Sequence, residues 1–114
     1  MKIVNRENAE HYTWGGVCDG WHLLKSNGLS VIQEQVPPGG AEVKHYHEQA
    51  YQFFFVLSGE ATMEIGDKRI VLGSQQGVSV PPKVAHRLLN DGKQELSFLV
   101  VSAPISHGDR VLVG

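Results

Sequence analysis

The chain has 114 residues, of which 41% are hydrophobic and 19% are charged. This size and composition exclude a disordered chain and predict a single globular domain, 1–114, with a real hydrophobic core. The formal net charge is -2, from 10 basic and 12 acidic residues. Because the basic residues form no stripe along the sequence, we expect no nucleic-acid partner.

Cysteine content and hydropathy indicate the compartment. Cys18 is the single cysteine, which excludes an intrachain disulfide framework and favours a reducing environment. No apolar stretch is long enough to span a membrane, and residues 1–12 lack the apolar segment of a signal peptide. We therefore expect a cytoplasmic protein that does not bind membranes.

In chain order, residues 1–16 are polar and end in a glycine pair, so we expect an N-terminal arm or an outer strand there. Short runs rich in β-branched and aromatic residues follow, each bounded by turn-forming residues. These runs predict strands at 29–36, 43–47, 51–57, 61–65, 69–72, 78–80, 86–89 and 95–101. Gly66-Asp67 predicts a hairpin between the fourth and fifth strands. No window of ten or more residues shows helical spacing, so we expect an all-β, antiparallel sandwich or barrel.

Three histidines carry the strongest chemical signal. His45 and His47 are two residues apart in a predicted strand, and side chains at that spacing point to the same face. His86 opens another predicted strand, and each of the two strands follows a proline-rich turn. If the domain closes on itself, both turns can deliver their histidines into one interior. Three imidazoles and the side-chain oxygen of Gln52 suit one divalent transition metal and leave positions for water or substrate.

The two histidine-bearing stretches resemble the two signature motifs of the cupin superfamily. The first family motif is Gly, five residues, His-x-His, three or four residues, Glu, six residues, Gly, and this sequence matches it at Gly39, His45, His47, Gln52 and Gly59. The second motif is matched at Pro81, His86 and Asn90. The resemblance covers about half of the chain.

The resemblance implies a small, single-domain cupin (a monocupin) with the double-stranded β-helix fold, a jelly-roll-like antiparallel barrel. It implies one divalent transition metal, whether Ni, Zn, Mn, Fe or Co, bound by His45, His47, Gln52 and His86. It also implies a homodimer, since many small cupins are dimers.

This sequence departs from the family pattern at three positions. Gln75 and Lys83 stand where the second motif has glycine, and both departures concern turn geometry. Gln52 stands where the family usually has Glu, and this departure concerns chemistry. A neutral ligand leaves the site more positive, so a bound metal would be a stronger Lewis acid and its bound water more acidic. The site also loses a carboxylate that would serve as general base.

Strand alternation predicts which side chains line the interior. If Gln52 and His86 face inward, the side chains that follow them inward are Phe54, Val56, Leu88 and Asn90. On the strand at 29–36, alternation leaves two faces open: either Ile32, Glu34 and Val36 or Val31, Gln33 and Gln35. Gln33 and Gln35 would form a polar wall for a hydrophilic substrate. Phe53 and Phe55 then face outward, and we expect a second sheet or a partner subunit to cover them.

Outside the motifs, other residues have plainer interpretations. His11 and His22 are expected to be ordinary surface or edge histidines. The glycine and aspartate in residues 107–110 predict a turn. The alternative is a lid over the barrel mouth, in which Arg110 pairs with a substrate carboxylate. Trp14 and Trp21 are expected in the core or at an interface.

Three functions remain open from the sequence. The first is a metal-dependent enzyme that uses Lewis-acid chemistry of the isomerase or lyase type on a small polar, sugar-derived or carboxylate-bearing metabolite. The second is a metal-dependent dioxygenase. The third is a non-catalytic module that binds a sugar or another small molecule.

Overall fold

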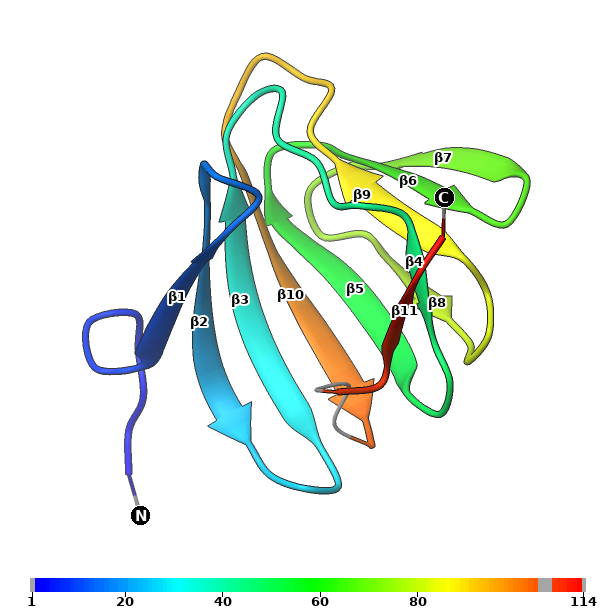
Figure 1. Cartoon of the computed structure of the whole chain (residues 1–114). Helices are drawn as coiled ribbons and strands as arrows, with labels where there is room; N and C mark the ends of the chain where they lie inside the picture. Colours follow the sequence, from blue (N-terminus) through cyan, green and yellow to red (C-terminus); the bar gives the residue numbers. More distant parts are fainter. Residues whose placement is uncertain (1, 105–107, 114) are drawn as a thin grey trace.

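The computed structural model describes residues 2–104 and 108–113, and the regular elements in these ranges are eleven β-strands (Figure 1). No helix capable of crossing a membrane is found in those ranges. The strands form two sheets, and every pairing between neighbouring strands is antiparallel. The expected all-β, antiparallel class is therefore confirmed.

The larger sheet has six strands. In spatial order they are β1 (Glu10–Trp14), β2 (Cys18–Lys25), β3 (Ser30–Val36), β10 (Leu96–Ala103), β5 (Tyr51–Ser58) and β8 (Gly77–Val80). The second sheet has five strands, in the order β11 (Arg110–Leu112), β4 (His45–His47), β9 (His86–Leu89), β6 (Ala61–Ile65) and β7 (Lys68–Leu72). Figure 1 shows the two sheets facing each other.

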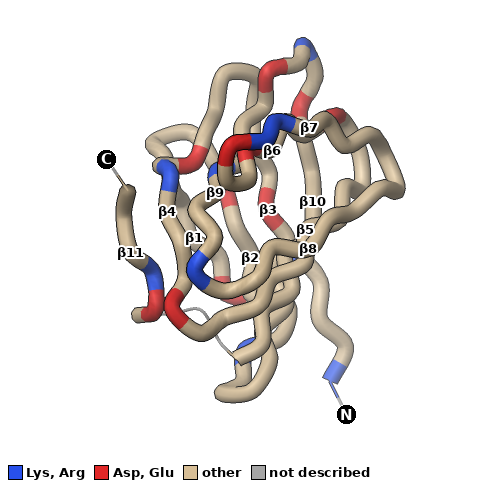
Figure 2. Tube along the Cα trace, turned by 90° about the vertical axis from the view of Figure 1, so that its right-hand side faces the viewer, with Lys and Arg blue, Asp and Glu red and all other residues tan. Residues whose placement is uncertain are grey.

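The alternation of the central strands places the core between the sheets. Along β5, Gln52, Phe54 and Val56 are buried while Tyr51 and Phe53 are exposed. Strand β10 alternates in the same way over its whole length. The largest fully buried apolar side chains lie in this interior: Phe98, Met63, Leu88, Leu96, Val36, Val56 and Val80. Charged residues of both signs are scattered along the trace (Figure 2).

The turns follow the sequence closely. The hairpin predicted at Gly66-Asp67 is confirmed, because Ile65 pairs with Lys68 across it. Two residues other than glycine have a positive φ among those described, Gln75 at 65° and Lys83 at 68°. These are the positions where the cupin motif has glycine. The backbone therefore keeps the left-handed conformation that the motif requires, although a side chain is now present.

This finding predicts a stabilising substitution. Lys83→Gly is expected to raise the free energy of unfolding by about 1 kcal/mol, because glycine adopts positive φ without the steric cost that lysine carries. Lys68→Gly in strand β7 is the matched control, and it should lower stability instead. Urea denaturation of the two variants beside the wild type measures both effects. A loss of stability in Lys83→Gly would contradict the prediction.

Candidate metal centre

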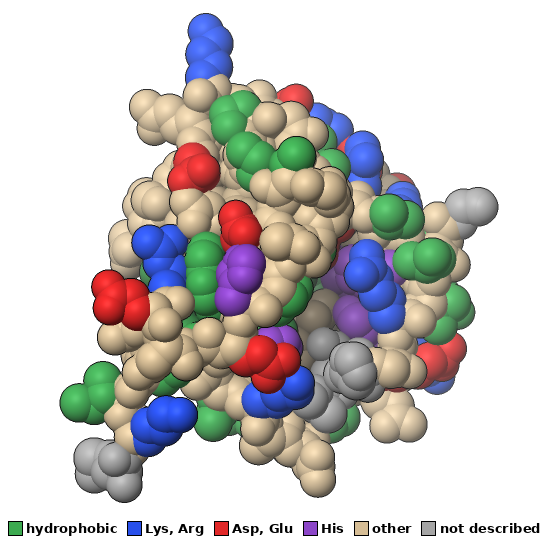
Figure 3. Space-filling model, turned by 60° about the vertical axis from the view of Figure 1, so that its left-hand side comes forward, with side chains coloured by type: hydrophobic (Ala, Val, Ile, Leu, Met, Phe, Trp, Pro, Cys, Tyr) green, Lys and Arg blue, Asp and Glu red, His purple; other side chains and the backbone are tan. Residues whose placement is uncertain are grey.

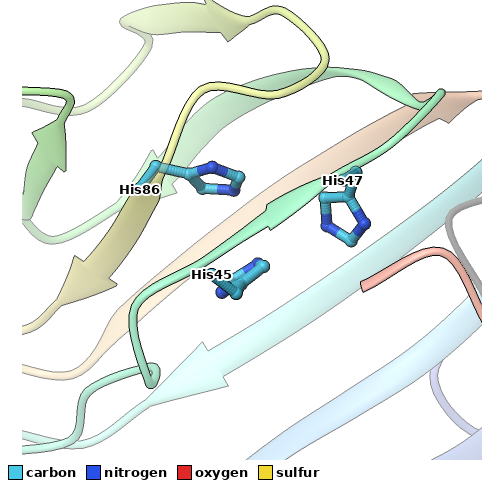
Figure 4. Close-up of side chains that lie close together, drawn as sticks. All are labelled: His45, His47 and His86. Atoms are coloured by element: carbon cyan, nitrogen blue, oxygen red, sulfur yellow. The ribbon is translucent and has the colours of Figure 1, made fainter. Parts of the chain in front are cut away.

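The three histidines of the two motifs meet inside the barrel. His45 and His47 lie on β4, and His45 is paired directly with His86 of β9. One nitrogen from each ring lies within 4.8 Å of the others. The three rings are buried and point toward one another (Figure 4). Two segments that are far apart in sequence thus present one cluster of imidazoles.

Gln52 reaches this cluster from the facing sheet. Its Oε1 lies 3.1 Å from His86 Nε2, and its Nε2 donates to Ser102 Oγ at 3.0 Å. The bond to Ser102 orients the amide so that its oxygen faces the histidines. The structure therefore brings together all four residues that the sequence predicts as metal ligands.

Hydrogen bonds to the backbone orient two of the imidazoles. His45 Nδ1 lies 2.7 Å from the carbonyl oxygen of Val43, and His86 Nδ1 lies 3.0 Å from that of Val84. Each Nδ1–H donates to its carbonyl, which leaves the Nε2 lone pair free. Burial lowers the pKa of His45 and of His47 to about 4, and it also lowers the pKa of His86. The rings are therefore neutral near pH 7, the form in which imidazole binds metal.

The His86–Gln52 contact supports a cation at this point. With His86 Nδ1–H donating to Val84, His86 Nε2 and Gln52 Oε1 are both acceptors, and they lie 3.1 Å apart in the buried interior. His47 Nδ1 is also buried, and it has no hydrogen-bond partner in the part of the chain that the structure describes. A cation that binds the lone pairs of His86 Nε2 and Gln52 Oε1 would remove the mismatch between these two acceptors. Three neutral nitrogens and one amide oxygen fit a divalent transition metal.

A cavity of about 440 Å³ opens beside the histidines, and Figure 3 shows histidine side chains on the wall of this hollow. Arg110 on β11 lines the cavity, with its Nη2 3.3 Å from His45 Nδ1. Asp109 accepts hydrogen bonds from three successive backbone N–H groups, those of residues 48–50. These bonds and the pairing with β4 hold Arg110 at the cavity wall. Arg110 therefore belongs to a strand rather than to the expected turn, and His107 lies outside the described residues.

A hydrogen-bonded pair on the opposite wall was not found from the sequence. Tyr12 of β1 donates from Oη to Glu34 Oε2 at 2.5 Å. The strand register places Gly20 between them, since Tyr12 pairs with Gly20 and Gly20 pairs with Glu34. A Cβ on Gly20 would lie 2.2 Å from the Tyr12 ring. The absence of a side chain at Gly20 therefore lets the tyrosine cross β2 and reach the carboxyl group on β3.

Two carboxyl groups share this end of the cavity. Burial, together with the nearby Glu42, raises the pKa of Glu34 to about 8. Burial also raises the pKa of Glu42 to about 7, while its Oε1 accepts a hydrogen bond from the Leu88 N–H. Besides the histidines, the cavity therefore carries two carboxyl groups that exchange protons near neutral pH.

Several expected cavity positions are corrected. Gln33 and Gln35 lie on the outer face of β3 and line a separate depression there. The alternation of β3 places Ser30, Ile32 and Glu34 on the inner face, because the apolar Ile32 and Val36 of that face are driven into the interior. The expected polar wall of glutamines is therefore wrong.

Three of the four side chains predicted inward from β5 and β9 are not on the cavity wall. Phe54 lines the cavity, whereas Val56 and Leu88 lie in the apolar core below it. Asn90 donates to the carbonyl oxygens of Val36 and Gln94, so it fastens a loop. The alternation was right about direction, but the cavity is shorter than the strands that enclose it.

Two residues near the N-terminus also line the cavity. His22 lies on its wall, so the expectation of an ordinary edge histidine is wrong. Trp14 both lines the cavity and packs against the core. No sequence motif marks either residue, because both reach the cavity through the pairing of β1 and β2 with the main sheet.

Comparison with known proteins agrees with this geometry. The model of the cupin domain family matches residues 32–102, more than half of the chain, and the protein therefore belongs to the cupin family. Its fold is the double-stranded β-helix of small monocupins.

The chain is 27% identical over 89 residues to protein MJ1618 of Methanocaldococcus jannaschii, covering 77% of this chain and 71% of that protein. It is 25% identical to the polyketide synthase CurC of Streptomyces cyaneus over 69% of this chain, but it spans only 49% of CurC. The solved structure of the polyketide cyclase RemF from Streptomyces resistomycificus matches with a TM-score of 0.86 at 20% identity, covering 100% of this chain and 86% of that one.

Proposed function

We propose that this protein is an enzyme that holds one divalent transition metal with His45, His47, His86 and Gln52. It would act on the carbonyl or enol group of a small molecule by Lewis-acid chemistry of the isomerase or lyase type. The observation that carries the proposal is the buried contact between two acceptors, His86 Nε2 and Gln52 Oε1, beside a cavity of about 440 Å³ that Gln52 lines. That volume is in the range of small-molecule sites.

The mechanism assigns separate tasks to the two ends of the cavity. When bound, the metal supplies positive charge that polarises a substrate oxygen. Arg110, beside His45, adds a guanidinium that pairs with a carboxylate or a developing enolate. Glu34, with its pKa near 8, takes up or releases a proton at a carboxyl oxygen while Tyr12 Oη donates to it.

The sequence analysis names two kinds of substrate, a carboxylate-bearing metabolite and a sugar-derived one. Arg110 supports a carboxylate-bearing substrate, because its guanidinium lies on the cavity wall. A sugar-derived substrate has less support, because Ile32, Phe54 and Val100 give the cavity an apolar wall. The homodimer also stays a prediction, and it is supported by the stacking of Phe53 on Phe55 on the outer face, where Phe53 is 42% exposed.

Elemental analysis of tag-free protein tests the proposal. We expect close to one transition-metal ion per chain in the wild type and a loss of that metal in His47→Ala. His11→Ala is the matched control, because His11 is exposed and outside the cavity, where it pairs with Asp19. It should keep the metal.

The outcomes separate the candidate functions. Absence of metal in the wild type, even after incubation with nickel, zinc, manganese or iron, would contradict an enzyme that depends on a metal. Iron together with substrate-dependent oxygen uptake would instead support the dioxygenase alternative. Equal metal content in His47→Ala and His11→Ala would place the metal elsewhere.

A further inference from the structure

The side chains on the floor of the cavity form polar and apolar rows that alternate along the strands. Strand β10 lies between β3 and β5, and the register aligns their inward side chains in rows that cross the strands. The first row holds Ser30, Ser102 and Gln52, the second Ile32, Val100 and Phe54, and the third Glu34, Phe98 and Val56. All of these except Phe98 and Val56 line the cavity.

The middle row is purely hydrocarbon. Ile32, Val100 and Phe54 offer no hydrogen-bond donor or acceptor in their side chains. A sugar carries a hydroxyl on nearly every carbon, and those hydroxyls would lose water against this row without gaining partners. A flat ring instead places its carbon face on the row and removes apolar surface from water.

The first row ends in a buried hydroxyl that lacks a partner. Ser30 is 2% exposed, and its Oγ has no hydrogen-bond partner within residues 2–104 and 108–113. Ser102, next to it in the row, already accepts a hydrogen bond from Gln52. Because Ser30 lines the cavity, a polar atom inside the cavity is what can satisfy its hydroxyl. This end, where Gln52 contacts His86, suits a carbonyl or carboxylate oxygen.

The third row offers a different kind of polar contact. Glu34 and Tyr12 form their hydrogen bond there, and Glu42 lines the same cavity. A carboxyl group accepts a hydrogen bond from a hydroxyl in either protonation state. On β3, the first and third rows are four residues apart, on the order of 13 Å along the strand. A ligand that contacts both ends must therefore be elongated.

We propose that the cavity takes a flat fused-ring compound with a carbonyl or carboxylate group at the histidine end and a neutral hydroxyl at the end formed by Tyr12 and Glu34. This inference rests on the proposed function, because that function places the reacting oxygen at the histidines. It narrows the substrate class from small carbonyl compounds in general to hydroxylated aromatic ones, and it excludes sugar acids.

Three probe compounds test the inference by isothermal titration calorimetry. The probes 6-hydroxy-2-naphthoate and 2-naphthoate differ only in the far hydroxyl, and D-glucuronate carries the same charge without a flat apolar face. We expect the wild-type protein to bind the hydroxynaphthoate about tenfold more tightly than the naphthoate, as one additional hydrogen bond predicts. Both naphthoates should bind more tightly than D-glucuronate.

Variants locate the hydroxyl contact. Glu34→Leu should abolish the tenfold preference for 6-hydroxy-2-naphthoate over 2-naphthoate, and Tyr12→Phe should reduce it. Gln33→Ala is the matched control, because Gln33 lies on the outer face of the same strand. Circular dichroism checks that each variant is folded. If Glu34→Leu does not fold, Tyr12→Phe alone tests the hydroxyl contact.

Some results would overturn the inference. These are equal binding of the two naphthoates, tighter binding of D-glucuronate, or a tenfold preference that survives both Glu34→Leu and Tyr12→Phe. Metal content measured on the same samples separates this failure from that of the proposed function. A metal-loaded wild type that prefers D-glucuronate contradicts the ring compound alone. A metal-free wild type contradicts the proposed function, whichever probe binds.

Discussion

Replacing Gly20 by alanine is expected to lower the free energy of unfolding by roughly 2 to 5 kcal/mol, through overpacking and the loss of a buried hydrogen bond. The added Cβ would lie 2.2 Å from Cζ and 2.5 Å from Oη of Tyr12. The tyrosine ring is rigid, so it must leave its position over β2. Its departure breaks the hydrogen bond to Glu34 and leaves that buried carboxyl group without its partner.

Chemical denaturation of a small set of variants measures this effect. Gly28→Ala is the matched control, because no atom lies within 4 Å of the Cβ position there, and it should change stability by less than about 1 kcal/mol. The double variant Gly20→Ala with Tyr12→Ala should be about as stable as Tyr12→Ala alone, because the clash disappears with the ring. Additive losses in the double variant would show that the cost at Gly20 does not come from Tyr12.

Phe98→Ala is expected to cost roughly 3 to 5 kcal/mol, the usual range for removing a buried aromatic side chain. Phe98 is fully buried on the central strand β10, and its ring centroid lies 6.2 Å from that of Phe54. It also stands between Glu34 and Val56 in the third row of the cavity floor. Alanine would leave a void beneath Glu34, in a domain whose total stability is on the order of 5 to 15 kcal/mol.

Phe53→Ala provides the comparison within the same sheet. Phe53 pairs with Val101 of β10 but points outward and is 42% exposed. Its removal should cost less than about 1 kcal/mol. Urea unfolding of the two variants gives the contrast directly. Similar losses in both would mean that the outer face is covered to the same degree as the interior.

The histidine centre could be predicted from the sequence, because residue spacings within short segments determine it. The two-residue spacing of His45 and His47 fixes their common face, and each strand follows a proline-rich turn. The glycine positions of the motifs are equally local, and even the departures Gln75 and Lys83 keep the backbone that the motif requires. Alternation then placed Gln52 and Phe54 inward, on the same face as the histidine cluster.

The residues of the opposite wall could not be predicted from the sequence, because only the pairing of strands brings them together. Tyr12 meets Glu34 only through the register of β1, β2 and β3, with a glycine between them. Arg110 reaches the cavity only because β11 pairs with β4. On β3 both faces contain polar residues, so alternation left two choices. Gln33 and Gln35 would form a polar wall, yet the interior takes Ile32, Val36 and the carboxyl group of Glu34 between them.

The position of β10 has a consequence for the rate at which this protein folds. The strand closes the middle of the larger sheet by pairing with β3, so Gln33 and Ser97, which are 64 residues apart, come into contact. A chain must close such a long loop before the contact gives any stabilisation, and domains dominated by distant pairings fold in milliseconds to seconds. The cavity beside the histidines has β10 in its floor. It therefore cannot exist in a partly folded intermediate, and the capacity to bind should appear together with the last cooperative step of folding.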